Sequence, residues 1–156
     1  MKAQARTALH IDLARESRGW APSLASLREW AGAALGRRGV GREISVRVVG
    51  PRESRQLNAR YRRRDKPTNV LSFPSAPMPE IKPQPLGDLV ICPQVLRAEA
   101  LAQGKTLRAH WAHLVVHGAL HLAGYDHEHE HEARRMERRE IAVLKRLGFG
   151  NPYRVV

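Results

Sequence analysis

The sequence has a single cysteine, Cys92, among its 156 residues, so it has no partner for an internal disulfide. It also lacks any run of about 18 or more apolar residues, which argues against a membrane-spanning helix. The opening residues include Lys2 and Arg6, but their apolar stretch is interrupted by polar side chains and is too short for a secretory signal. These absences together predict a reducing compartment, the cytoplasm.

Acidic residues are scarce, at 15 against 27 lysines and arginines, and the formal net charge is +12. Such an excess favours a polyanionic partner, because cationic side chains displace counterions from a phosphate backbone. An arginine-rich proteome would produce the same total. However, residues 52–66 contain seven basic side chains and only two acidic ones, and such clustering favours contact with phosphate.

The spacing of apolar side chains indicates the fold. Alternation predicts strands at residues 8–13 and 43–49, and short apolar runs predict two more at 69–73 and 87–92. Helical spacing predicts helices at 22–36, 54–61 and 93–104, one from Thr106 through a pair of histidines, and one at about 132–147. The proline-rich segment 74–85 is expected to be a loop. We therefore predict a single α+β domain over residues 1–156, with about four strands in a mixed sheet and about five helices.

Three histidines near the C-terminal end form the most informative pattern. His117 and His121 are four residues apart, so on a helix they share a face. Gly124 follows and can end the helix with a positive φ, after which His127 could fold back toward the first two. Three neutral imidazoles suit one zinc ion and leave a fourth position open, as in catalytic zinc sites. The sequence thus predicts a three-histidine metal site at the end of a helix.

Other histidines compete for this role. His110 and His113 lie on the same predicted helical face, but a rise of about 1.5 Å per residue places His113 about 12 Å from His121, too far to share one ion. Two adjacent pairs remain, His113 with His117 and His117 with His121, and the glycine turn with His127 favours the second. Histidines 129 and 131 are expected in a solvated loop leading into the last helix. Asp126 could orient a ligand imidazole or cap the turn.

The histidine spacing matches that of metzincin proteases, H-E-x-x-H-x-x-G-x-x-H. Gly118 stands where those proteases have the glutamate that acts as general base. The metal-binding pattern is therefore present without the proteolytic base.

A run of arginines follows the short helix predicted at 54–61. Guanidinium groups bind phosphates through paired hydrogen bonds, so Arg60, Arg62, Arg63 and Arg64 are candidates for contact with a nucleic-acid backbone. One of them could also reach the metal and stabilise charge developing on a phosphate. The residues alone do not say which.

Three segments carry a resemblance to a known family: residues 57–74 (LNARYRRRDKPTNVLSFP), 87–91 (GDLVI), and 110–117 (HWAHLVVH) leading into the histidine motif. Together they resemble the YbeY family of bacterial endoribonucleases, from about residue 43 to residue 153. The resemblance implies a metal-dependent, single-strand-selective endoribonuclease that acts in maturation of the 3′ end of 16S rRNA and in ribosome quality control. It further implies association with the small ribosomal subunit and its assembly factors.

Residue roles follow from the same resemblance. His117, His121 and His127 match the family's metal ligands, here taken to hold one Zn²⁺, and Arg62 matches its functional arginine. We expect Arg60, Arg63, Arg64 and Lys66 to contact RNA. Two alternatives compete: a ribosome-binding assembly factor with a structural metal and little nuclease activity, and a metal hydrolase of small phosphoesters or amides. The latter gives no reason for the charge of +12.

Overall fold

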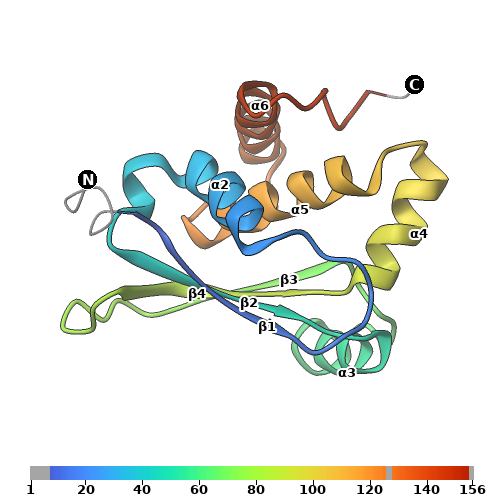
Figure 1. Ribbon diagram of the computed structural model, residues 1–156, viewed down its shortest axis with the longest axis horizontal. Helices are drawn as coiled ribbons and strands as arrows, with labels where there is room; N and C mark the ends of the chain where they lie inside the picture. The colour runs from blue at the N-terminus through green and yellow to red at the C-terminus, as the bar shows by residue number, and fades with distance from the viewer. Residues whose placement is uncertain (1–7, 126–127, 155–156) are drawn as a thin grey trace.

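The computed structural model describes residues 8–125 and 128–154, which form a four-stranded sheet with helices on both faces (Figure 1). The strands are β1 (His10–Arg15), β2 (Arg42–Val48), β3 (Val70–Pro74) and β4 (Gln84–Ile91). Their order in the sheet is β1-β2-β4-β3. β2 is parallel to both β1 and β4, and β3 is antiparallel to β4. The predicted single α+β domain with a mixed sheet is confirmed.

Five α-helices lie within the described residues, as predicted. They are α2 (Leu24–Leu35), α3 (Pro51–Arg62), α4 (Pro93–Gln103), α5 (Leu107–Leu122) and α6 (Glu130–Arg146), with a short 3₁₀ turn, η1 (Gly36–Gly39), after α2. Figure 1 shows α2 and α5 over one face of the sheet, α6 beyond α5, and α3 on the opposite face. In the described part of the chain, no helix is both long and apolar enough to cross a membrane.

Local chemistry explains where most of the helices begin and end. The Thr106 hydroxyl accepts a hydrogen bond from the Ala109 amide and caps α5, as its sequence position predicts. Gly104 ends α4 with φ of 66°. Helix α3 begins at Pro51, three residues before the predicted start, because proline at the first helical position has a suitable φ and no amide hydrogen to satisfy.

The main hydrophobic core lies between the sheet and helices α2 and α5, with α6 closing one side. Its largest fully buried side chains include Trp30 of α2, Trp111 of α5 and Met136 of α6. Helix α5 is therefore packed against neighbours over most of its circumference. A second, smaller cluster of Val49, Leu71 and Val90 lies against Leu57 of α3. The core thus holds α5, which carries the predicted metal ligands His117 and His121, in a fixed position.

Candidate metal centre

Helix α5 carries four histidines in a row along one side. The ring centres of His117 and His121 are 5.3 Å apart, and His113 lies 6.2 Å from both His110 and His117. The adjacent face of the helix carries Gly118, which packs against the sheet. A Cβ at this position would lie 2.7 Å from Leu89 Cδ2. The structure therefore leaves no room at this position for the glutamate of a metzincin protease. The histidine side chains lie on the adjacent side of the helix, next to the face that packs against the sheet.

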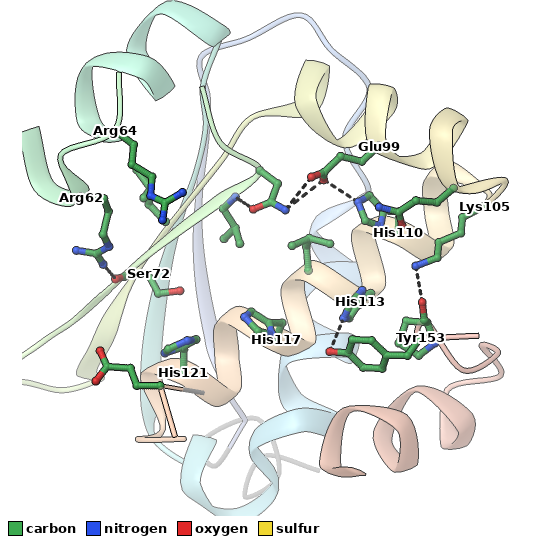
Figure 2. Close-up of a pocket in the computed structure, with 17 residues that line it drawn as sticks. Arg62, Arg64, Ser72, Glu99, Lys105, His110, His113, His117, His121 and Tyr153 are labelled. Atoms are coloured by element: carbon green, nitrogen blue, oxygen red, sulfur yellow. Dashed lines mark hydrogen bonds and ion pairs between the residues drawn. The ribbon is translucent and has the colours of Figure 1, made fainter. Parts of the chain in front are cut away.

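The histidines form one wall of an open cavity of about 1040 Å³. Arg62 and Arg64, which come from the end of α3 and the residues after it, lie across the cavity from His117 and His121 (Figure 2). Arg62 is held in place by its own contacts. Its Nη2 donates to the Ser72 carbonyl at 3.0 Å, and its guanidinium lies 5.4 Å from the centre of the Phe73 ring. The cavity thus combines imidazole nitrogens with fixed positive charge.

The predicted RNA-binding residues do not all face this cavity. Arg64 lines it, whereas Arg60 lies in a separate hollow with Arg55. Arg63 is exposed and ends α3 in the left-handed conformation, with φ of 59°. The Lys66 carbonyl accepts a hydrogen bond from Asn58, which orders the turn after α3. The basic segment therefore places Arg62 and Arg64 close to the histidines and the other basic side chains farther away.

A buried carboxylate joins two of the histidines. Glu140 of α6 has a side chain only 1% exposed, and its oxygens lie 2.8 Å from His113 Nε2 and 2.8 Å from His117 Nδ1. The Tyr153 hydroxyl donates to the same carboxylate at 2.6 Å. Burial raises the pKa of Glu140, but hydrogen bonds from His113, His117 and Tyr153 and the positive potential at His117 outweigh it and lower that pKa to about 2. Glu140 is therefore ionised at neutral pH.

Two neighbours of Glu140, His113 and Tyr153, stay uncharged. Burial lowers the pKa of His113 below its ordinary value despite the carboxylate, so this imidazole is neutral at pH 7. Burial and the adjacent charge of Glu140 raise the pKa of Tyr153, so its phenol remains protonated and able to donate. An ionised carboxylate can only accept hydrogen bonds. The hydrogens must therefore lie on His113 Nε2 and His117 Nδ1.

His113, His117 and Glu140 together form a candidate metal-binding cluster, with ligand atoms all within 4.8 Å of one another. The sequence argument had set the pair His113–His117 aside, and Glu140 was missed. A signal for Glu140 was present, because it occupies the buried face of α6 with Met136, Val143 and Leu144. A charged residue at a core position of an amphipathic helix is rarely buried unless it is paired.

The other predicted site residues are placed as follows. His117 and His121 both line the cavity. His127 and Asp126 lie outside the described residues. His129 is the residue before the first turn of α6, where its side chain makes no capping hydrogen bond, and His131 is exposed within that turn. The helix therefore begins slightly earlier than predicted, and His131 belongs to it and not to a preceding loop. The structure thus brings two of the three predicted ligands together in the cavity with Arg62.

A second polar group lies at the far end of the same cavity. His110 Nε2 is 2.9 Å from Glu99 Oε1, and the Asn69 amide donates to both oxygens of that carboxylate at 3.2 Å. Burial opposes ionisation of Glu99, but these hydrogen bonds lower its pKa below the ordinary value. In Figure 2 this group lies beyond His113, away from His121. The cavity therefore has one end at which His117 and His121 face the arginines, and another end lined by the His110–Glu99 pair and Lys105.

An α+β domain with clustered histidines and arginines around one open cavity has the features of a metal-dependent hydrolase acting on phosphate esters. The family model for Endoribonuclease YbeY matches residues 21–148. Because this match covers most of the chain, the protein belongs to the YbeY endoribonuclease family, whose members are metal-dependent hydrolases. Its substrate class is therefore RNA.

The fold is similar to a solved structure. The solution structure of TM1509 from Thermotoga maritima is 25% identical in sequence, with a TM-score of 0.58. The similarity covers 92% of this chain and 99% of that chain. The similarity of fold therefore covers nearly the whole α+β domain, including residues outside the segment that the family model matches.

Proposed function

We propose that residues 1–156 form one endoribonuclease domain that cleaves single-stranded RNA, with His117, His121 and His127 holding one Zn²⁺. The observation that carries this proposal is the shared cavity, in which His117 and His121 face Arg62 and Arg64. Imidazole ligands suit zinc, and an open ligand position suits a catalytic ion. A bound Zn²⁺ would supply Lewis-acid stabilisation of the negative charge that develops on the phosphoryl group.

The chain's own residues perform the remaining tasks. Arg62 is oriented by its bond to the Ser72 carbonyl, so its other guanidinium nitrogens can donate to phosphoryl oxygens as their charge increases. Arg64 lies beside it on the cavity wall and can bind a neighbouring phosphate. The net charge of +12 favours a long polyanion over a small ester. These features support a single RNA strand as substrate.

The biological role that we propose is maturation of the 3′ end of 16S rRNA in the cytoplasm, with small-subunit quality control. Membership of the family supports an RNA substrate, and the buried, unpaired Cys92 is compatible with a reducing compartment. The small ribosomal subunit and its assembly factors are the proposed partners. Comparing rRNA 3′ ends in cells with and without the active protein tests this role, and unchanged ends would refute it.

The site itself is tested by substituting His121→Ala. We expect loss of bound zinc and loss of cleavage of a defined single-stranded RNA, with an unchanged circular dichroism spectrum. His131→Ala is the matched control, because His131 is exposed on α6, and it should retain both metal and activity. Cleavage at the wild-type rate by a His121→Ala protein without metal would rule out the proposed site.

Removal of the metal by a chelator tests the assembly-factor alternative. If the metal were structural, chelation would unfold the domain. The core between the sheet, α2 and α5 is an extensive cluster of buried apolar side chains, which includes Trp30, Leu89 and Trp111. We therefore expect chelated wild-type protein to lose cleavage but to keep cooperative unfolding in urea.

A further inference from the structure

Glu140 is a buried charged residue in the described part of the protein. Burying a charge costs several kcal/mol unless strong hydrogen bonds compensate. Glu140 has such bonds, since three donors from two separate segments converge on its two oxygens. Its neighbours on the same face of α6, Met136, Val143 and Leu144, are apolar. A carboxylate kept at this position therefore has a task besides packing.

The hydrogen bond to His117 indicates that task. Oε1 of Glu140 lies 2.8 Å from His117 Nδ1, while Tyr153 and His113 contact Oε2. A carboxylate oxygen that accepts at this distance requires a hydrogen on His117 Nδ1. A neutral imidazole carries one hydrogen, so His117 Nε2 is then the unprotonated nitrogen with a lone pair. His117 lines the cavity together with His121. A carboxylate on the far nitrogen of a ligand imidazole sets its tautomer, fixes its ring orientation and makes it a stronger ligand.

We propose that Glu140 is a positioning residue for the metal centre, which holds His117 in the tautomer and orientation that present Nε2 to the metal. This inference rests on the proposed function, in which His117 and His121 are metal ligands. Glu140 itself touches neither metal nor RNA in this arrangement.

Two further residues hold the carboxylate in place. Oε2 of Glu140 accepts from Tyr153 at 2.6 Å and from His113 at 2.8 Å, which leaves Oε1 for His117. With its hydrogen on Nε2, His113 has an unprotonated Nδ1, and that atom is buried with no hydrogen-bond partner among residues 8–125 and 128–154. Lys105 donates to the Pro152 carbonyl at 2.6 Å and so ties the segment that carries Tyr153 to the rest of the domain. In Figure 2, Tyr153 approaches His113 from the C-terminal segment.

The rival arrangement makes His113, His117 and Glu140 direct ligands of the metal. Ligand atoms around tetrahedral zinc are about 3.3 Å apart, given bonds of about 2.0–2.1 Å. The oxygens of Glu140 lie 2.8 Å from each histidine nitrogen, which is a hydrogen-bond distance. In addition, Tyr153 already donates to Oε2. The geometry therefore favours a carboxylate that hydrogen-bonds to the ligand histidine over a carboxylate that binds the metal directly.

The test compares zinc affinity and the His117 tautomer in four variants: Glu140→Gln, Tyr153→Phe, His113→Ala and His121→Ala. Zinc affinity is measured by competition with a chelator, and the His117 tautomer is read from long-range ¹H–¹⁵N spectra of the metal-free proteins. For Glu140→Gln we expect an affinity about 10- to 100-fold weaker and a shift of the His117 hydrogen toward Nε2. Tyr153→Phe is the matched control, because it removes one donor to Oε2 and leaves the bond to His117 intact. Its effect should be much smaller.

The outcomes separate this inference from the proposed function. If His121→Ala loses zinc but Glu140→Gln keeps full affinity and the wild-type tautomer, Glu140 has no positioning role and the three-histidine site stands. If Glu140→Gln and His113→Ala abolish binding while His121→Ala does not, the metal lies on the rival cluster and both proposals fail. The wild-type spectrum is informative even if a variant does not fold. A hydrogen on His117 Nε2 in the metal-free wild type would refute the inference directly.

Discussion

Substitution of Gly118 by alanine tests how tightly the metal-bearing helix is held against the sheet. Gly118 is buried in α5, and an added Cβ would lie 2.7 Å from Leu89 Cδ2 and 3.3 Å from Leu89 Cδ1. Leu89 is 0% exposed and belongs to the main core, so its methyl groups have little space into which to move. Either Leu89 leaves its rotamer or α5 moves away from β4.

The magnitude follows from two opposing terms. Replacing glycine by alanine inside a helix stabilises the folded state by about 0.5–1 kcal/mol. Forcing an extra methyl group into a well-packed core costs about 1–3 kcal/mol. We therefore expect Gly118→Ala to lower the free energy of unfolding by about 1 kcal/mol. Gly32→Ala on α2 is the matched control, because nothing lies within 4 Å of its added Cβ, and it should be stabilising.

Urea unfolding of the wild type, Gly118→Ala and Gly32→Ala measures how each substitution changes the free energy of unfolding. The difference between the variants isolates the steric term, so it should be about 1–3 kcal/mol. Introducing Leu89→Val, which removes the nearest methyl carbons, should reduce the penalty of Gly118→Ala. Equal stabilisation by both alanine substitutions would show that the contact between Gly118 and Leu89 does not constrain α5.

Two further predictions concern charge. The pKa of Glu140 is about 2 in the folded protein against 4.5 for an ordinary glutamate, so its ionisation adds stability that is present above pH 4.5 and is lost as pH falls toward 2. That contribution is about 3–4 kcal/mol at roughly 1.4 kcal/mol per pH unit. In urea unfolding of the metal-free protein, the Glu140→Gln variant should lose less free energy of unfolding than the wild type as pH falls from 4.5 toward 2. The same pH dependence in both proteins would contradict this prediction. In RNA cleavage, Arg62→Ala should lower kcat by about 100-fold, whereas Arg64→Ala should weaken RNA binding and reduce the slope of log affinity against log salt by about 0.7. Arg55→Ala is the control because Asp65 already pairs with Arg55 at 2.8 Å; an equal loss of kcat in all three variants would argue against a specific role for Arg62.

The elements of the fold could be predicted because their signals are local. Ser23 and Thr106 cap the helices that follow them, and Gly104 ends α4, each through hydrogen bonds or dihedral angles of the chain within a few residues. Boundaries were less accurate where the signal was overlooked, as at Pro51. The pairing of His117 with His121 was equally accessible, since a helical pitch places residues four apart on one face.

The surroundings of those histidines depend on contacts between distant segments. Glu140 is 23 residues from His117 and 27 from His113, and no local rule places α6 so that its carboxylate reaches both imidazoles. Arg62 faces the histidines only because α3 and β3 bring its guanidinium to the Ser72 carbonyl. The sequence showed only that Gly118 replaces the metzincin glutamate. That this glycine allows α5 to pack closely against Leu89 depends on the tertiary structure.

The sequence by itself determined the α+β class, the helix that carries the histidines, and the residue types suited to zinc and phosphate. These follow from periodicity, capping and side-chain chemistry, which act over one or two turns of chain. Tertiary structure alone decided which nitrogen of His117 carries hydrogen, how closely α5 approaches β4, and which arginines share the cavity. Those features depend on packing between elements, because burial and the approach of a carboxylate or a leucine side chain exist only once the core has formed.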